Sequence, residues 1–338
     1  MEAEVTWENL DWPTLDRIRA GFLTGSAAKG PYWQSLADLA HYDFTFAERI
    51  GWKWDHVLRE LNRRGWAPAQ GKLLDWGCGS GVAHRRVIST WPDSTQSVRV
   101  FDHSTWAEAY ATQRVNDRFP NLDVRSWERS ESIATLTISH VLNELDKESA
   151  QDLMQTIQSA TKVIWVEPGT SEVAGQLVQW REKLRDSFRV VFPCPHQGAC
   201  GLRTPANALH WCHHFASPPA GVFADSNWVK FGQRAGIDLR SLPYSALVLE
   251  KPTAAIETRE AAVEDLAGRI IGRPKVSKPC TRFLGCDSDQ VQRLEMPKKL
   301  NARLAKKLDR PNAPRLFRWK HEQGKVIAMD PLVRDDES

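Results

Sequence analysis

A glycine-rich turn at the end of an apolar run constrains the fold of this chain more than any other feature. The sequence LLDWGCGSG predicts an apolar strand that ends near Asp75, followed by a turn with three glycines, Gly77, Gly79 and Gly81. Glycine lets the backbone adopt positive φ and approach a ligand closely. The dinucleotide fingerprint G-x-G-x-x-G is matched only in part, because Val82 stands where its last glycine would be and is expected to begin a helix.

An acidic residue follows the next predicted strand. The segment SVRVFDHS ends in Asp102 and His103, and an acidic side chain at this place in a Rossmann-like sheet binds ribose hydroxyls. Together with the glycine turn, this segment resembles motif I of the class I S-adenosylmethionine-dependent methyltransferases, in which the turn holds the methionine moiety. The resemblance implies cofactor contacts from Asp75, Gly77, Cys78, Gly79, Gly81, Asp102 and His103. Cys78 is expected to serve the turn through its backbone and small size.

Strands and helices alternate along the middle of the chain. Strands are predicted over residues 135–145, 162–170 and 244–251, and helices over 147–160 and 172–186. This alternation predicts an α/β fold with a doubly wound, mostly parallel sheet. Ligands bind beyond the carboxyl ends of such strands, where the sequence places Ser139, His140, Asn143, Glu144, Glu167 and Gly169.

Four cysteines have a spacing that indicates a metal or iron–sulfur site. Cys194, Cys200 and Cys212 follow a C-x5-C, C-x11-C pattern, and Cys286 lies far downstream. Soft thiolates select zinc or iron–sulfur clusters. Structural zinc sites usually open with a C-x2-4-C knuckle, which is missing here, whereas iron–sulfur ligation tolerates wider spacing. We therefore favour an iron–sulfur cluster and keep zinc as the alternative.

The surroundings of these cysteines leave other interpretations open. His196, His213 and His214 stand beside them and offer imidazole nitrogen, which suits zinc. Isolated, buried cysteines would be the ordinary alternative to a metal site. The three upstream cysteines, however, fall beside Pro, Gly and His rather than in apolar runs, which favours ligation.

Positive charge is concentrated near the carboxyl terminus. Residues 298–325 hold ten Lys or Arg against Asp309 and Glu322, a balance of +8, whereas the whole chain carries +3. Such asymmetry indicates a polyanionic partner, and nucleic acid is the usual one. Phe317 and Trp319 lie among these cations, where they could either stack on bases or pack in a core.

Several motifs together resemble one family. LLDWGCGSG, FDHS, SHVLNEL, VEPGT, the CPH and WCHHF cysteine segments and GRPKVSK with CDSD are similar to the methyltransferase-like proteins of the mitochondrial small ribosomal subunit and their bacterial relatives, over residues 30–330. The resemblance implies a class I methyltransferase fold, association with small-subunit ribosomal RNA, and a four-iron, four-sulfur cluster. Its implied ligands are Cys194, Cys200, Cys212 and Cys286, with Cys280 as a rival for the fourth place.

The compartment is inferred from the first residues and from hydropathy. The first twenty residues hold five acidic residues against two arginines, whereas transit peptides avoid acidic residues. No apolar run approaches the ~20 residues that span a bilayer. A bacterial cytoplasmic location is therefore expected, with the mitochondrial matrix as the less favoured alternative. Nothing in the sequence indicates an oligomeric state.

Few residues in the sequence indicate which reaction the protein catalyses. Enzymes that methylate amino groups commonly carry an Asn/Asp-Pro-Pro-aromatic tetrapeptide after the fourth strand, where this chain has SHVLNEL. His140, Asn143 and Glu144 are candidates for a base or for shaping the pocket. An RNA methyltransferase is the favoured function. A noncatalytic ribosome-assembly factor and a cluster-dependent RNA-binding sensor are the alternatives.

Three regions are predicted along the chain. A helical amino-terminal region spans 1–68, the methyltransferase-like core spans 69–251 with a cysteine-rich insertion at 190–216, and a basic RNA-binding domain with short strands spans 252–338.

Overall fold

The computed structural model describes residues 4–24, 32–253, 267–288, 290–310 and 313–332. The chain divides into two compact units. Unit 1 comprises Met1–Glu167 and Ser217–Leu242, and unit 2 comprises Pro168–Ala216 and Pro243–Ser338. This division does not follow the predicted boundaries, because the cysteine-rich segment groups with the carboxyl-terminal region. Whether the three predicted regions fold independently stays a prediction.

Helices form the amino-terminal part of unit 1. They are α1 (Trp12–Thr24), α2 (Leu36–Tyr42) and α3 (Glu48–Arg63), with one π-helical turn at Asp43–Ala47 between the last two. Ser35 caps α2 by accepting a hydrogen bond from the backbone nitrogen of Asp38. In α3, Trp52, Trp54, Val57, Leu58 and Leu61 are buried. Amphipathic spacing thus explains why this segment forms a helix against the core.

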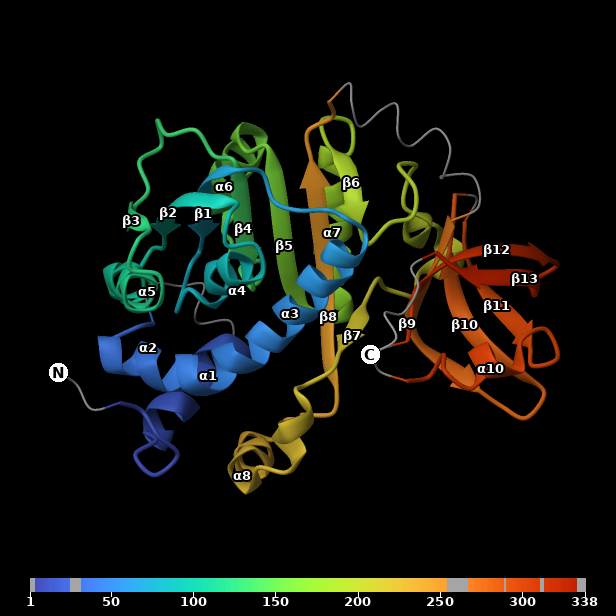
Figure 1. The fold of residues 1–338 in the computed structure, drawn as a ribbon, viewed down its shortest axis with the longest axis horizontal. Coiled ribbons are helices and arrows are strands. Elements are labelled where there is room, and N and C mark those ends of the chain that lie inside the picture. Colours follow the sequence, from blue (N-terminus) through green and yellow to red (C-terminus); the bar gives the residue numbers. More distant parts are fainter. Residues whose placement is uncertain (1–3, 25–31, 254–266, 289, 311–312, 333–338) are drawn as a thin grey trace. The chain divides into compact units, whose positions relative to one another are not determined.

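A parallel sheet forms the centre of unit 1. Its strands are β1 (Gly71–Trp76), β2 (Thr95–Phe101), β3 (Asp123–Ser126), β4 (Thr135–Ser139) and β5 (Lys162–Pro168). They lie side by side in the order β3-β2-β1-β4-β5, and every neighbouring pair is parallel (Figure 1). Helices α4 (Val82–Thr90), α5 (Thr105–Arg118) and α6 (Lys147–Ser159) connect the strands, and α8 (Ser226–Ala235) also belongs to this unit. This strand order is that of a Rossmann-like fold, which confirms the predicted α/β class.

Strand β4 ends earlier than the predicted strand at 135–145. His140 follows it with φ 58°, a left-handed conformation that stops the extended backbone. The chain then turns at residues 142–144. The predicted helix at 147–160 agrees with α6.

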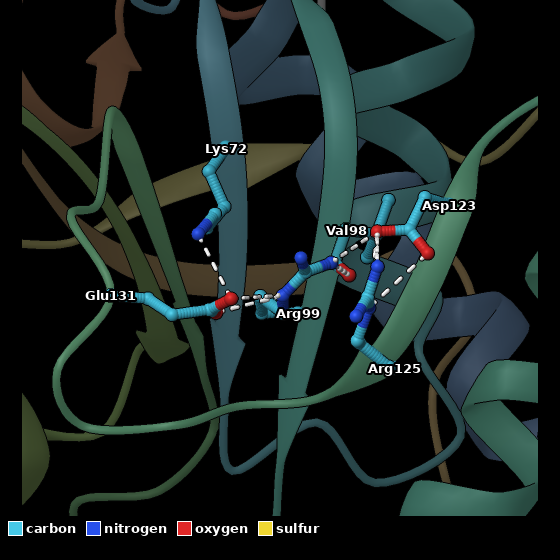
Figure 2. A network of polar contacts seen from close by, with 6 residues as sticks. All are labelled: Lys72, Val98, Arg99, Asp123, Arg125 and Glu131. Atoms are coloured by element: carbon cyan, nitrogen blue, oxygen red, sulfur yellow. Dashed lines mark hydrogen bonds and ion pairs between the residues drawn. The ribbon is translucent and has the colours of Figure 1, made fainter.

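A polar network ties three strands together (Figure 2). The buried Arg99 on β2 donates through Nε to both carboxylate oxygens of Glu131, at 3.0 and 2.7 Å, and through Nη1 to Asp123 at 3.1 Å. Lys72 on β1 lies 3.0 Å from Glu131, and Arg125 contacts Asp123 at 2.8 Å. A buried guanidinium is stable only when its donors are satisfied, and Glu131 and Asp123 provide that here.

Unit 2 begins with helix α7 (Ser171–Leu184). Thr170 caps this helix, and the apolar positions Val173, Leu177, Trp180 and Leu184 are all buried, as their helical spacing predicts. Strand β6 (Arg189–Phe192) pairs antiparallel with β8 (Leu242–Glu250), and β7 (His214–Ala216) also pairs with β8. The cysteine-rich segment between β6 and β7 contains two short 3-10 turns.

A closed five-stranded barrel forms the rest of unit 2 (orange and red in Figure 1). Its strands are β9 (Ala267–Val276), β10 (Cys280–Cys286), β11 (Val291–Pro297), β12 (Leu316–Glu322) and β13 (Lys325–Pro331), and α10 (Ala302–Ala305) lies between β11 and β12. The strands follow one another around the barrel in the order β10-β11-β13-β12-β9. All neighbours are antiparallel except β11 and β13, which are parallel.

Two aromatic residues of the basic segment lie in the barrel core. Phe317 is 0% exposed and Trp319 is 4% exposed, and both pack with Phe283, Leu294 and Met296. The possibility that they stack on RNA bases is therefore wrong. Residues two apart on a strand share a face, so Phe317 and Trp319 face inward while Arg318 and Lys320 are exposed.

Candidate cofactor and cluster sites

The glycine turn has the conformation that its sequence predicts. Gly77, Gly79 and Gly81 have φ of 69°, 50° and 79°, all in the left-handed region. A Cβ atom at Gly77 would lie 2.7 Å from Val141 Cγ1, whereas a Cβ at Gly79 would meet nothing within 4 Å. The turn thus packs closely on one side and leaves open space at Gly79, where a ligand could approach the backbone.

Asp102 lies against this turn. The backbone nitrogen of Gly79 donates to Asp102 Oδ2 at 2.9 Å, and the backbone nitrogen of Ser104 donates to Oδ1 at 3.0 Å. Burial raises the pKa of Asp102, although these two hydrogen bonds oppose the shift. Each carboxyl oxygen has a second lone pair, so the group can still accept hydrogen bonds from a ligand. The neighbouring His103 is exposed.

Asp75 lies in the interior rather than at the surface of the turn. Its carboxyl group is 0% exposed, with Oδ2 at 2.7 Å from His84 Nδ1 and Oδ1 at 2.9 Å from Thr137 Oγ1. Both oxygens are therefore engaged by the protein. Asp75 joins β1, α4 and β4 below the turn, which positions the glycines.

Cys78 contributes its backbone to the turn. Its nitrogen donates to the carbonyl oxygen of Phe101 at 3.0 Å, beside the bond from Gly77 to the same oxygen at 2.8 Å. Burial, followed by the negative charges of Asp102 and Asp75, raises the pKa of the Cys78 thiol well above its usual range. The side chain is a buried thiol of the turn.

A lysine that sequence reasoning missed lies beside His140. Lys53, on α3, is 5% exposed, and its Nζ lies 3.1 Å from His140 Nε2. Burial and the neighbouring Arg49 lower the pKa of Lys53 to about 7. Burial and Lys53 lower the pKa of His140 well below its usual range. Two basic nitrogens therefore meet at the carboxyl end of β4, and the imidazole is neutral at physiological pH.

Two carboxyl groups lie in this region, Glu167 near Lys53 and Glu144 near Glu167 and Asp102. Glu167 Oε1 accepts hydrogen bonds from the backbone of Val141 at 3.0 Å and from Trp165 Nε1 at 2.7 Å, while Oε2 is buried with no hydrogen-bond partner among the described residues. Burial raises the pKa of Glu167 to about 7. Burial, Asp102 and Glu167 together raise the pKa of Glu144 to about 8, and Tyr32 is its hydrogen-bond partner. Asn143, the remaining candidate, is exposed.

In unit 2, a cavity is lined by the four predicted ligand cysteines, Cys194, Cys200, Cys212 and Cys286. Cys286, at the end of β10, is 8% exposed and lies 3.6 Å from His196 Nε2. Cys280, at the other end of β10, contacts Ser277 instead and does not line the cavity. The structure thus brings Cys286, and not Cys280, together with the three upstream cysteines.

A buried arginine faces the thiols. Arg181 Nε donates to Cys194 Sγ at 3.1 Å, and its Nη2 donates to the carbonyl oxygens of His196 at 3.3 Å and Gly198 at 2.8 Å. It also forms an ion pair with Glu182. Arg181 therefore holds the cysteine segment in place, and its positive charge partly offsets the burial that raises the pKa of the Cys194 thiol.

The buried thiols of the cavity have raised pKa values. Burial raises the pKa of Cys200 to about 11 and that of Cys212 and Cys286 well above the usual range, and the neighbouring cysteines raise it further. Four mutually repelling thiolates are stable only around a cation. Within the part of the chain that the structure describes, however, no three His, Cys, Asp or Glu residues are arranged to hold a metal ion.

A zinc ion and an iron–sulfur cluster both accept four thiolate donors, but they hold them at different separations. Zinc holds each thiolate at ~2.3 Å and so draws four of them into one tight tetrahedron. A four-iron cluster inserts iron and sulfide atoms between the thiolates and keeps them farther apart. The four thiols line one cavity, and the choice between the two groups stays a prediction.

The Rossmann-like strand order and the glycine turn with its acidic partner define a methyltransferase-like α/β protein. A family model described as mitochondrial small ribosomal subunit Rsm22 matches residues 54–299. The chain belongs to this family, as its motifs predict. A comparison with curated proteins found no match.

Solved structures of methyltransferases are similar to the chain at low identity. The plantazolicin methyltransferase BpumL with SAH is 12% identical, with a TM-score of 0.39 over 71% of this chain and 100% of that one. Magnesium protoporphyrin IX methyltransferase from Synechocystis PCC 6803 is 13% identical, with a TM-score of 0.38 over 72% and 97%. TrmK from M. capricolum is 9% identical, with a TM-score of 0.33 over 58% and 68%. No helix in the described ranges is long and apolar enough to cross a membrane.

Proposed function

We propose that this protein binds S-adenosylmethionine at the glycine turn, acts on or binds small-subunit ribosomal RNA, and carries a four-iron, four-sulfur cluster in unit 2. The observation that carries the proposal is the hydrogen bond from Gly79 to Asp102. This bond joins the open glycine turn to the acidic residue that follows β2. These two elements are expected to hold the two ends of such a cofactor.

Carboxyl groups near the turn are available to the positive groups of the cofactor. S-adenosylmethionine carries a sulfonium and an ammonium group beside its carboxylate. Glu144 interacts electrostatically with Asp102 and Glu167, and because its pKa is raised to about 8, its negative charge develops around that pH. Asp102 would accept hydrogen bonds from the ribose hydroxyls, and the backbone at Gly79 would face the methionine moiety. Bound cofactor supplies the methyl group.

Lys53 and His140 are the groups best placed to act on a methyl acceptor. A nucleophile that carries a proton must lose it when it is methylated, and neutral nitrogen bases near pH 7 accept protons effectively. Lys53, with a pKa lowered to about 7, is such a base, whereas His140, with a pKa lowered well below its usual range, is the weaker base; their Nζ and Nε2 atoms lie 3.1 Å apart where β4 ends. Asn143 and Glu144 would shape the pocket rather than carry the proton.

A noncatalytic assembly factor is the second candidate function. The stretch SHVLNEL lacks the acceptor tetrapeptide of amino-methylating enzymes, and the left-handed His140 turns its ring toward Lys53. In that case the cofactor acts as a structural or sensing ligand. A cluster-dependent RNA-binding sensor is a variant of this function, in which loss of the cluster weakens RNA binding.

In unit 2 the cluster would be held by Cys194, Cys200, Cys212 and Cys286, with zinc as the alternative occupant. Its chemistry is to crosslink four thiolates through iron. Arg181 compensates negative charge at Cys194, and Cys286 joins barrel strand β10 to the cysteine segment.

The partner and the compartment rest on the family. The family's description names the mitochondrial small ribosomal subunit, which supports ribosome association and leans away from the bacterial cytoplasm. Small-subunit ribosomal RNA is the proposed partner. Fractionation of the native host, with this chain detected by antibody, decides between cytoplasm and mitochondrial matrix.

Calorimetric titration with S-adenosylmethionine tests the cofactor site. Asp102→Ala is expected to weaken binding at least ~tenfold, a loss of ~1.4 kcal/mol, while Asp117→Ala, an exposed carboxylate on the following helix, leaves it unchanged. Equal affinity of both variants would reject the site.

Iron and acid-labile sulfide analysis of anaerobically purified protein tests the cluster. About four iron and four sulfide per chain are expected, lost in Cys212→Ser and retained in Cys280→Ser. One zinc without sulfide would instead identify a zinc site.

A further inference from the structure

The topology of the barrel in unit 2 is that of an OB-fold. Strands β9, β10 and β11 form an antiparallel meander, β11 then pairs in parallel with the last strand, β13, and β12 closes the barrel against β9. A helix lies between the third and fourth strands, at α10. OB-folds bind oligonucleotides on the face of their second and third strands, which here are β10 and β11.

The barrel is strongly basic. Residues 267–332 contain 16 Lys or Arg and 6 Asp or Glu, a balance of +10. On the outer surface, Lys275, Arg282, Glu295 and Lys325 stand opposite one another in register across β9, β10, β11 and β13. Arg293 stands two residues before Glu295, on the same face of β11. Four of these five residues are cations.

These cations are available to a ligand. Lys275, Arg282, Arg293 and Lys325 are all exposed, and Arg282 contacts Glu295 at 2.9 Å with 66% of its side chain exposed. An exposed ion pair of this kind contributes little to stability. Its arginine can therefore exchange the carboxylate for a phosphate.

The same face has no aromatic platform. The Phe, Tyr and Trp residues of 267–332 are Phe283, Phe317 and Trp319, and all three are at most 5% exposed in the barrel core. His321 is half-buried and lies 2.9 Å from Gln292. OB-folds that bind single strands stack successive bases on exposed aromatic rings. The described part of this barrel therefore offers charge without stacking.

We propose that this outer face of the barrel, called the barrel face and defined by Lys275, Arg282, Arg293 and Lys325, docks onto the phosphate backbone of double-helical RNA. The inference rests on the RNA association in the proposed function and specifies its surface and its ligand. A-form helices are recognised mainly through phosphates, 2′-hydroxyls and shape. A row of cations without aromatic rings suits that backbone and offers no stacking surface to unstacked bases.

Binding of the full-length protein to two labelled RNAs tests the proposal. One RNA is a duplex of about 16 base pairs, and the other is oligouridine of the same length. Affinities are measured by fluorescence anisotropy between about 50 mM and about 200 mM salt. We expect the duplex to bind at least ~tenfold more tightly than oligouridine.

A charge-neutralised barrel face identifies the surface. The quadruple variant Lys275→Gln, Arg282→Gln, Arg293→Gln, Lys325→Gln is expected to reduce the slope of log affinity against log salt by ~3 to 4, about 1 for each lost phosphate contact. The single variant Arg293→Gln reduces it by ~1. The matched control removes four exposed cations from unit 1, at Arg59, Lys147, Lys230 and Arg240, and keeps the slope.

Each outcome has a distinct meaning. The barrel face is overturned as a duplex site if oligouridine binds as tightly as the duplex. It is also overturned if the control loses as much of the slope of log affinity against log salt as the quadruple variant does. RNA association stands in both cases. Wild-type protein that binds neither RNA at low salt overturns RNA association itself, and the inference with it. The single variant keeps the proposal testable even if the quadruple variant fails to fold.

Discussion

Replacement of Asp75 tests whether this residue positions the glycine turn or contacts the cofactor. The carboxyl group is 0% exposed, and its two oxygens lie 2.7 Å from His84 Nδ1 and 2.9 Å from Thr137 Oγ1. Thr137 Oγ1 also lies 3.2 Å from the carbonyl oxygen of Leu74, so the hydroxyl retains a partner after the change. His84 is also 0% exposed, and its Nε2 has no hydrogen-bond partner in the described residues.

The expected cost follows from these contacts. In Asp75→Ala, His84 loses its partner in a dry environment, which costs ~1–3 kcal/mol, and two bonds to a buried acidic group are lost. We expect the free energy of unfolding to fall by ~3–5 kcal/mol in all, the range for breaking a buried pair. Asp75→Asn keeps the bond to Thr137, and His84 can change its tautomer, so the expected loss is ~1 kcal/mol.

Urea unfolding followed by tryptophan fluorescence measures both losses, and calorimetry measures S-adenosylmethionine affinity where the variants are folded. Because Asp75 has no exposed surface, Asp75→Asn should bind the cofactor within ~threefold of the wild type, less than 1 kcal/mol. A stable Asp75→Asn protein that has lost ~tenfold or more in affinity would refute the reasoning and make Asp75 a direct ligand.

Three further predictions concern single side chains. Burial and neighbouring carboxylates raise the pKa of Glu144 to about 8. S-adenosylmethionine should therefore bind more tightly as pH rises through 8, because Glu144 then becomes negatively charged. SAH, whose sulfur carries no charge, should respond less. Glu144→Gln should flatten this dependence in calorimetry. Burial and Arg49 lower the pKa of Lys53 from 10.5 to about 7 in the folded protein. Between these two pH values the unfolded chain binds one proton more than the folded chain, so the free energy of unfolding should rise with pH by a few kcal/mol. Lys53→Met should abolish this rise in urea titrations. Gly268→Ala places a Cβ 2.0 Å from the Trp319 ring and should destabilise the barrel by ~1–3 kcal/mol, seen as a lower midpoint of thermal unfolding; an unchanged midpoint would mean that Trp319 moves freely.

The sequence predicted those parts of the fold that depend on residues close together along the chain. The glycines of the turn need positive φ, and that requirement is visible in the sequence itself. Helix α7 was predictable because Val173, Leu177, Trp180 and Leu184 repeat at helical spacing. Alternation along β12 could also have shown that Phe317 and Trp319 share the inner face.

Contacts between distant segments were not predictable in the same way. Lys53 lies 87 residues before His140 in the chain, and a lysine in an amphipathic helix is usually solvated. The motif does not reveal that both carboxyl oxygens of Asp75 have partners, His84 and Thr137, and its contact with the cofactor stays a prediction. The barrel order depends on pairings between strands far apart, such as β9 with β12, which composition does not encode.

The place of Cys286 on strand β10 has a consequence for the order in which the protein matures. Cys194, Cys200 and Cys212 are synthesised at least 74 residues before Cys286, counted from 212 to 286. Domains fold from the amino terminus as they are translated, so unit 1 up to β5 is complete while the thiol set is still one member short. In the folded structure, the last cysteine joins the other three from the end of β10, which pairs with β11 in the barrel. Completion of the four-cysteine cavity therefore requires that synthesis has passed Cys286, the last of the four.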